Sequence, residues 1–311
     1  MNNSIPIRNV SVEEVCKIVS QSPAELIALE EKRYHSEVSE VANHIHAVDR
    51  KRRIVLLCGP SSAGKTTTAN LLRIALADLG TTAYVVSLDD FYLGKGRAPL
   101  LPNGKYDYES IDALDVQRLL ACVRELTETG RTELPIFDFN AHAPKAETRH
   151  LVLEDDAAVI FEGIHAFHPR LQEVMPQDGT IRLFINTLSR FVLNGDVWLK
   201  RRDLRMCRRI LRDDQFRNSP FSNTMEMWPQ VVRGEDMYMF PYTDTADCVI
   251  NTAFSYEPCI LKTPLCERLA VVGEECPHQY VAKRLLERLS VFPDIPCELL
   301  PQNSILREFT G

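Results

Sequence analysis

One short motif restricts the fold of this chain more than any other feature. The residues Gly59-Pro-Ser-Ser-Ala-Gly64-Lys65-Thr66 match the pattern G-x-x-x-x-G-K-[ST] in full. An apolar run at 54–58 directly precedes the motif, and a helical pattern at 67–79 follows it. Glycines let such a loop wrap tightly, so that backbone N–H groups and a helix N-terminus point at phosphate oxygens. This strand–loop–helix context predicts a phosphate-binding loop.

The loop residues divide the work of holding a nucleotide. Lys65 is expected to reach the β- and γ-phosphates of ATP, and the Thr66 hydroxyl to bind Mg²⁺. The full set that we expect to contact ATP here is Gly59, Pro60, Ser61, Ser62, Ala63, Gly64, Lys65, Thr66 and Thr67.

Further apolar runs predict the rest of a sheet. They lie at 83–88, 159–161, 181–185 and 249–250, and helical stretches separate them. Strands that are apolar on both faces and alternate with helices indicate a parallel sheet covered on both sides. The predicted fold class is therefore α/β, a doubly wound parallel sheet of the kind that carries such phosphate-binding loops.

Carboxylates follow two of these predicted strands. Asp89 and Asp90 end the second run, and Glu162 ends the third. The carboxyl ends of parallel strands border the crevice where open α/β sheets bind ligands. Asp89 could accept the proton of an attacking hydroxyl group, although the Asp-Asp pair could instead cap the following turn. Glu162 is expected to hold Mg²⁺ together with Thr66.

Charge and cysteine usage exclude several classes of protein. A net charge of −7 and a pI near 5.7 argue against general nucleic-acid binding. Nine cysteines without a CxxC pair suggest neither a disulfide framework nor a zinc ribbon. A polar N-terminus and the lack of a long apolar run predict a cytoplasmic protein that does not bind membranes. One basic cluster, at 200–217, fits either a compact polyanion or a solvated helix face.

Three regions are expected along the chain. Residues 1–50 form a helical extension with one long helix at 24–47, which could serve as a packing or dimer element, so a homo-oligomer is one predicted state. Residues 51–262 form the nucleotide-binding domain, with a lid near 196–230. Residues 263–311 form an appendage packed on that domain, with a helix at 279–289.

The motifs resemble those of one family. The series GPSSAGKTT, SLDDFY, YDYESIDALD, VIFEGIHAFHP and RDLRMCRRILRD is similar, in that order, to the uridine kinase and phosphoribulokinase family, and is closest to its uridine kinase branch. The likeness covers 53–262. The closing segment resembles the tail of longer bacterial uridine-kinase-like proteins, whose N-terminal domain, related to one in threonyl-tRNA synthetases, is expected to be missing here or reduced to the helices before residue 50.

The resemblance implies a role for individual residues. Asp89 would be the general base on a nucleoside 5′-hydroxyl group, and Asp107 would bind the ribose hydroxyls. Three arginines of the lid, Arg205, Arg208 and Arg217, would contact the donor phosphates. Arg205 and Arg208 would be catalytic residues together with Asp89 and Lys65. The acceptor pocket would be lined by Tyr92, Tyr106, Phe137, Phe139 and His142. The family places a small residue and an arginine after this histidine, where the present chain has Ala143, Pro144 and Lys145.

The predicted activity is therefore transfer of the γ-phosphoryl group of ATP·Mg²⁺ to a nucleoside, with uridine or cytidine as the expected acceptor in pyrimidine salvage. Two alternatives remain at this point. One is a kinase for another small alcohol, such as a sugar phosphate, and the other is a non-catalytic nucleotide sensor. Retention of Asp89, Glu162 and the arginines together disfavours the sensor, because a sensor does not need an acceptor base.

Overall fold

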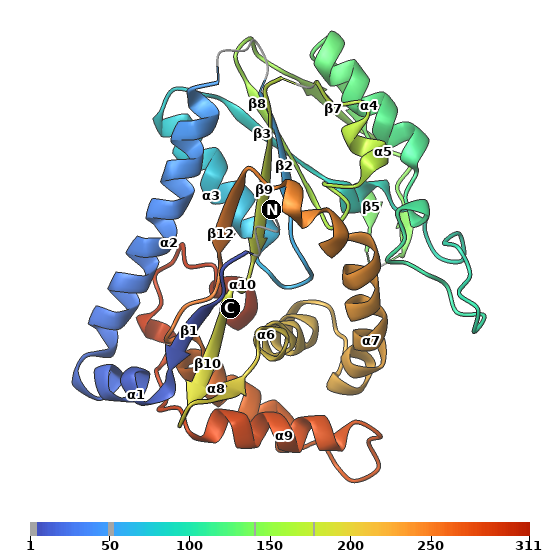
Figure 1. Cartoon of the computed structure of the whole chain (residues 1–311). Coiled ribbons are helices and arrows are strands. Elements are labelled where there is room, and N and C mark those ends of the chain that lie inside the picture. The colour runs from blue at the N-terminus through green and yellow to red at the C-terminus, as the bar shows by residue number, and fades with distance from the viewer. Residues whose placement is uncertain (1–4, 49–52, 140, 177) are drawn as a thin grey trace.

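A parallel sheet forms the centre of the molecule (Figure 1). The computed structural model describes residues 5–48, 53–139, 141–176 and 178–311. Five strands pair in the order β12-β9-β2-β8-β3, and every pairing is parallel. Their bounds are β2 (Arg53–Cys58), β3 (Ala83–Ser87), β8 (Ala158–Gly163), β9 (Thr180–Asn186) and β12 (Cys248–Asn251). Each predicted apolar run is one of these strands, so the α/β prediction is confirmed.

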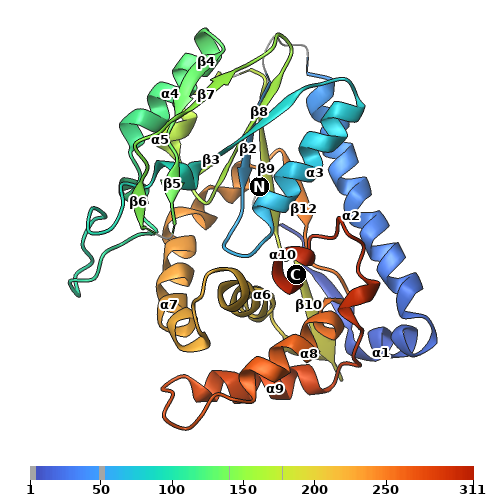
Figure 2. The same ribbon diagram turned by 180° about the vertical axis from the view of Figure 1, so that it is seen from behind.

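Helices cover both faces of this sheet (Figures 1 and 2). Alternate residues of β2 point into two separate hydrophobic clusters, because successive side chains of a strand point to opposite faces. Val55 and Leu57 join the cluster that contains α2 (Pro23–His46) and α3 (Lys65–Asp78). Ile54 and Leu56 join the cluster that contains α4 (Val116–Glu128) and α5 (Pro169–Gln172). The sheet is therefore buried on both sides, which explains its continuous apolar strands.

The N-terminal segment contributes a strand as well as helices. β1 (Arg8–Ser11) pairs in parallel with β10 (Ser189–Leu193), which pairs antiparallel with β11 (Asp196–Leu199). Ser11 then caps α1 (Val12–Gln21), and Ser22 caps α2 with Pro23 in its first turn. The long helix agrees with the expected range, whereas β1 was not predicted. The segment before residue 50 is thus joined to the central domain by a second, three-stranded sheet.

The region expected to form a lid is tightly packed. It contains α6 (Arg201–Phe216) and α7 (Phe221–Tyr238), and α6 lies against α7, α8 (Glu257–Leu269) and α10 (Arg307–Thr310). The middle of α6, from Leu204 to Leu211, is buried without interruption. An open, mobile lid would instead carry its arginines on a solvated face, so the structure differs from the expected arrangement in this region.

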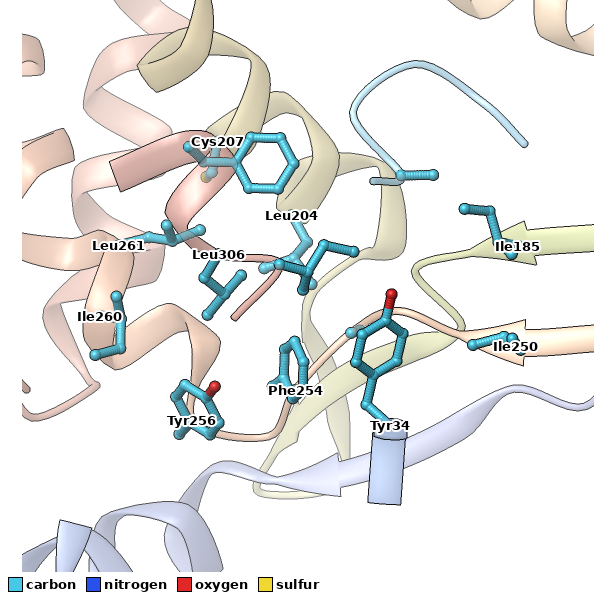
Figure 3. Packing of buried hydrophobic residues seen from close by; sticks show 14 of the residues in the cluster. Tyr34, Ile185, Leu204, Cys207, Ile250, Phe254, Tyr256, Ile260, Leu261 and Leu306 are labelled. Carbon is cyan, nitrogen blue, oxygen red and sulfur yellow. The ribbon is translucent and has the colours of Figure 1, made fainter. Parts of the chain in front are cut away.

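The last part of the chain closes the molecule. α9 (Gln279–Ser290) is the helix expected at 279–289, and it packs on α8. Leu306, just before α10, lies in one buried cluster with Leu204 of α6, Phe254 and Tyr34 of α2 (Figure 3). Four segments far apart in sequence therefore meet in one core next to the central sheet.

Shorter elements complete the fold. They are η1 (Leu88–Phe91), η2 (Ile111–Ala113), β4 (Arg131–Leu134), β5 (Phe137–Asp138), β6 (Ala143–Pro144), β7 (Arg149–Val152), η3 (Phe240–Thr245) and η4 (Cys297–Leu299). The nine cysteines are free thiols. Among the helices that the structure describes, none has both the length and the apolar character needed to cross a membrane.

Candidate active site

The predicted phosphate-binding loop joins β2 to α3. Gly64 adopts a left-handed backbone with φ of 85° and stands at the N-cap of α3. A methyl group on this glycine would lie 2.0 Å from Cδ1 of Ile305, so both backbone and space require glycine here. The first turn of α3 carries no acidic residue. Its free N–H groups and partial positive charge therefore suit a phosphate.

A polar cluster forms where β3 and β8 end beside this loop. Glu162 on β8 accepts hydrogen bonds from Ser87 Oγ at 2.9 Å and from Thr66 Oγ1 at 3.5 Å. Lys65 Nζ donates to the Pro60 carbonyl at 3.3 Å. Thr66 and Glu162 are thus brought together, as the Mg²⁺ prediction requires, and their oxygen donors suit this ion, which usually keeps water and substrate phosphates as its other ligands.

The environment of Glu162 favours a bound cation. Burial raises the pKa of this carboxyl group to about 7, the nearby Lys65 ammonium opposes that shift, and the charge of Asp89 adds to it. A carboxyl group that ionises with difficulty gains most from a positive ion beside it. The residues present therefore fit a Mg²⁺ ion at this position.

The two aspartates after β3 have different surroundings. Asp90 Oδ1 accepts a hydrogen bond from the backbone N–H of Phe137 at 3.4 Å, so it holds the loop that carries the predicted aromatic residues. Asp89 faces the polar cluster, since its charge raises the pKa of both Glu162 and Glu109. Asp90 therefore bonds a loop 47 residues further along the chain and not the turn that follows the pair, and the role of Asp89 as a base stays a prediction.

A wide hollow of about 1240 Å³ adjoins this cluster. Aromatic residues predicted for the acceptor pocket form part of its wall, and arginines of α6 and its C-terminal end form another part: Tyr106, Phe139, His142, Arg209, Arg212 and Arg217. Phe137 packs against two of the other aromatic rings at tilted and edge-on angles, with centroid distances of 5.7 Å to Tyr92 and 5.1 Å to Phe139. The hollow therefore joins an aromatic surface to a cationic one.

Asp107 lies outside this hollow and is tied to α7. Its buried carboxylate accepts hydrogen bonds from Tyr238 Oη at 2.7 Å and from Arg233 Nη1 at 3.1 Å. Both bonds fall on Oδ2. The structure thus gives Asp107 protein partners that the sequence did not reveal.

Arg205 and Arg208 do not project into the hollow, contrary to the expectation for lid arginines. Each is almost completely buried, at 1% and 0% exposure. Arg205 forms a two-pronged ion pair with Glu235 at 2.5 and 2.7 Å, and Arg208 forms one with Glu257 at the same distances. Burial of a guanidinium group requires such pairing, which is why both side chains turn inward.

Both arginines also reach the phosphate-binding loop from behind. Arg205 Nη1 donates to the Ser61 carbonyl at 3.0 Å, and Arg208 Nη1 donates to the Ser62 carbonyl at 3.3 Å. Carbonyl oxygens held by guanidinium groups point away from the cradle, so the loop N–H groups are free to face the opposite way. Two exceptions are the N–H of Ser61, which donates to Glu235 at 3.1 Å, and the N–H of Ala63, which donates to the Pro60 carbonyl at 3.2 Å.

Two side chains of the site were missed from the sequence. Arg209 Nη1 donates to Ser61 Oγ at 2.8 Å and also lines the hollow. Burial raises the pKa of Glu109 to about 7, and the charges of Arg209, Asp89 and Lys65 all act on it. A signal existed for each, because Arg209 follows Arg208 in the basic cluster and Glu109 stands two residues after Asp107.

The chain's end also contacts the nucleotide loop. Glu308 Oε2 accepts a hydrogen bond from Thr67 Oγ1 at 2.6 Å, and Glu308 is part of the wall of the hollow. The ring of Phe309 lies under the Arg208 guanidinium, with 5.0 Å between the guanidinium carbon and the ring centroid. Residues beyond 300 are therefore part of the site's framework.

The five-stranded parallel sheet, the loop at its central strand and the acidic cluster beside it define the class of P-loop proteins. Within that class, residues 54–255 match the model of the phosphoribulokinase / uridine kinase family, and the chain belongs to this family.

Named relatives agree with this assignment. The chain is 28% identical over 199 residues to a chloroplastic uridine/cytidine kinase of Arabidopsis thaliana, covering 63% of this chain and 37% of that protein. It is 30% identical over 186 residues to a uridine kinase of Schizosaccharomyces pombe, covering 59% of this chain and 37% of that one. The chain therefore spans little more than a third of the length of these relatives.

A solved structure supports the fold alone. A Silicibacter protein named as a candidate fructose transport system kinase aligns with a TM-score of 0.51 at 19% identity. The alignment covers 68% of this chain and 98% of that protein.

Proposed function

We propose that this chain transfers the γ-phosphoryl group of ATP to the 5′-hydroxyl group of a pyrimidine nucleoside, uridine or cytidine. One observation carries the proposal. Asp89 comes two residues after Ser87, whose hydroxyl group donates to Glu162, and the same carboxylate accepts from Thr66 of the loop. The charges of Lys65 and Asp89 also act on the pKa of Glu162. An acceptor base beside a phosphate cradle is what transfer to an alcohol needs, and a nucleotide sensor does not require it.

In the proposed reaction, Asp89 accepts the proton of the 5′-hydroxyl group as its oxygen bonds to the γ-phosphorus atom. The bond between that phosphorus and the oxygen of the β-phosphate breaks, and the electron pair leaves with ADP. Lys65 and the N–H groups of the loop stabilise negative charge on the transferred group. Mg²⁺, when bound through Thr66 and Glu162, would neutralise further charge on the phosphates.

The acceptor is assigned to the aromatic side of the hollow. Phe139 and Tyr106 offer flat apolar surfaces suited to a base, and His142 lies in the same wall. Asp107 is not part of this wall, but its chain neighbours Tyr106 and Tyr108 are, so we assign the ribose to the rim beside Asp107 and within that residue to Oδ1, because both protein hydrogen bonds occupy Oδ2. A buried carboxylate that binds hydroxyls discriminates strongly against analogues that lack them.

The arginines divide between two tasks in this proposal. Arg205 and Arg208 hold the loop in shape and act as positioning residues. Arg209 and Arg217, which line the hollow, contact the donor phosphates. Arginine suits this task because its planar guanidinium group can donate two parallel hydrogen bonds to the oxygens of a phosphate.

Replacement of Asp89 tests the proposed base. Asp89→Asn should lower kcat roughly 10²- to 10⁴-fold, the usual contribution of a general base, while the Kd for ATP changes less than about twofold. Asp90→Asn is the matched control, because an asparagine oxygen can still accept the Phe137 hydrogen bond, and it should keep most of the activity. Full turnover by Asp89→Asn would refute the assignment.

The acceptor is tested by coupled ADP release against a panel of uridine, cytidine, purine nucleosides and sugar phosphates. Uridine or cytidine should give the highest kcat/KM. A sugar phosphate as the best acceptor would replace the proposed substrate class. Tight ATP binding without stimulation by any acceptor would favour the nucleotide sensor.

A further inference from the structure

One arginine of α6 differs from all the others. This helix carries six arginines: Arg201, Arg202, Arg205, Arg208, Arg209 and Arg212. Five of them have a carboxylate oxygen within 4 Å. Arg201 has no such partner within the described part of the chain, although it is only partly exposed to solvent. Burial lowers its pKa, and the neighbouring charges of Arg205, Arg202 and Arg190 lower it further.

Arg201 lies in the wall of a second hollow, of about 550 Å³. The polar and charged lining residues are Asn186, Arg190, Lys200, Arg201, Arg202, Arg205 and Asp236. The lining thus holds five cationic side chains and one acidic one. Asp236 is already paired with Arg202, and Arg205 is paired with Glu235, so Arg190, Lys200 and Arg201 are the lining cations whose charge these carboxylates do not balance.

Two other cations of this hollow, Arg190 and Lys200, also carry positive charge that no carboxylate in the described part of the chain neutralises. Arg190 Nε donates to the neutral side chain of Asn9 at 2.6 Å. Neither Arg190 nor Lys200 pairs with a carboxylate among the residues placed by the structure. Like charges around a common hollow repel one another, and partial burial reduces their screening by water. An anion bound between them would relieve this repulsion.

We propose that this hollow is a binding site for a small organic phosphate, separate from the active site. Several arginines line this hollow, and a planar guanidinium group can donate two parallel N–H bonds to the oxygens of one phosphate. The two hollows share no lining residue, and Arg205, whose guanidinium group reaches Ser61, stands between this one and the nucleotide loop.

The size and the apolar part of the wall select the class of ligand. Roughly 300–1,000 Å³ is typical of sites for organic small molecules, whereas a lone phosphate ion would fill only a fraction of this hollow. Ile7, Val197 and the ring of Phe240 also line it. A phosphate group carried on a flat or apolar body, as in a nucleotide-sized phosphate ester, would satisfy both parts of the wall.

Calorimetric titration of the full chain with phenyl phosphate tests this proposal, with inorganic phosphate as the smaller probe. We expect phenyl phosphate to bind Lys65→Ala, whose nucleotide loop is impaired, as tightly as the unmodified chain. Inorganic phosphate should bind roughly tenfold more weakly, because it makes no contact with the apolar wall. Arg201→Gln should weaken phenyl phosphate binding at least tenfold, and Arg124→Gln, an exposed arginine on α4, should not change it.

A second measurement separates a ligand-binding arginine from a structural one. Without ligand, Arg201→Gln should unfold in urea at the same or a higher concentration than the unmodified chain, because the substitution removes repulsion. Binding of phenyl phosphate that is lost in Lys65→Ala but kept in Arg201→Gln would overturn the proposal. So would a clear loss of stability in ligand-free Arg201→Gln, or equal affinity for the two probes.

Discussion

Replacing Glu257 by glutamine offers a direct test of how the nucleotide loop is held. Glu257 and Arg208 are both fully buried, and their ion pair uses two hydrogen bonds, at 2.5 and 2.7 Å. Glu257→Gln keeps the shape of the side chain but leaves the Arg208 charge without a counterion. Removing one partner of a buried pair costs about 3–5 kcal/mol. That is a large part of the 5–15 kcal/mol typical of a folded protein.

The assay is urea unfolding followed by circular dichroism. The midpoint should fall while the slope m stays constant, because the change acts on stability and not on the surface exposed. Asp112→Asn is the control, since Asp112 and Arg170 form an exposed ion pair and such pairs contribute about 0–1 kcal/mol. A loss in Glu257→Gln no larger than that of Asp112→Asn would refute the reasoning.

A double replacement sharpens the test. Arg208→Met combined with Glu257→Leu removes both charges, and apolar replacements of a buried pair are often neutral or stabilising. We therefore expect the double variant to be more stable than Glu257→Gln. Its ATP affinity should stay low, because the Ser62 carbonyl has lost the guanidinium group that holds it. Recovery of both properties would show that Arg208 does not shape the loop.

Three further changes test individual contacts of the site. Burial raises the pKa of Glu109 from the ordinary 4.5 to about 7, so the stability linked to this group is complete below pH 4.5 and is lost as the pH rises through 7. The free energy of unfolding of Glu109→Gln, measured in urea, should thus equal that of the unmodified chain at pH 4.5 and exceed it at pH 8, by ~3 kcal/mol at most. An equal difference at both pH values would contradict this. Glu308→Gln should lower the Kd for ATP several-fold in calorimetry, by on the order of 1 kcal/mol, because it removes a negative charge beside Thr67. The control Glu298→Gln changes an exposed carboxylate and should leave the Kd unchanged. An unchanged Kd in Glu308→Gln would argue against repulsion between Glu308 and the phosphates. Gly64→Ala should lose ATP binding and roughly 1–3 kcal/mol of stability, because alanine is strained at φ of 85° and meets Ile305, and normal binding would show that the loop adapts.

The central sheet could be predicted because its signals are local. Apolar runs bounded by turns and helices mark each of the five strands, and the G-x-x-x-x-G-K-[ST] motif marks the edge at which they end. The pairing of Thr66 with Glu162 also followed, since the carboxyl ends of adjacent parallel strands must meet. β1 could not be found in this way, because its partner β10 lies about 180 residues further along the chain.

The orientation of the arginines could not be predicted for a related reason. Lysine and arginine are mostly exposed, so a run rich in arginine indicates a solvated or ligand-binding face. Arg205 and Arg208 are buried because Glu235 and Glu257 reach them, and those partners come 30 and 49 residues later. Spacing within the cluster therefore identified a charged helix but not which of its charges were already neutralised.

The contacts of Ile305 and Glu308 with the nucleotide loop have a consequence for proteolysis. The turn after α8 carries Val271, which is 81% exposed, and it precedes every residue of this closing segment. A nick there would turn an intramolecular contact into the association of two fragments, governed by mass action. Nucleotide affinity of the nicked protein would then decline on dilution, even though the cut lies outside the loop that binds the phosphates.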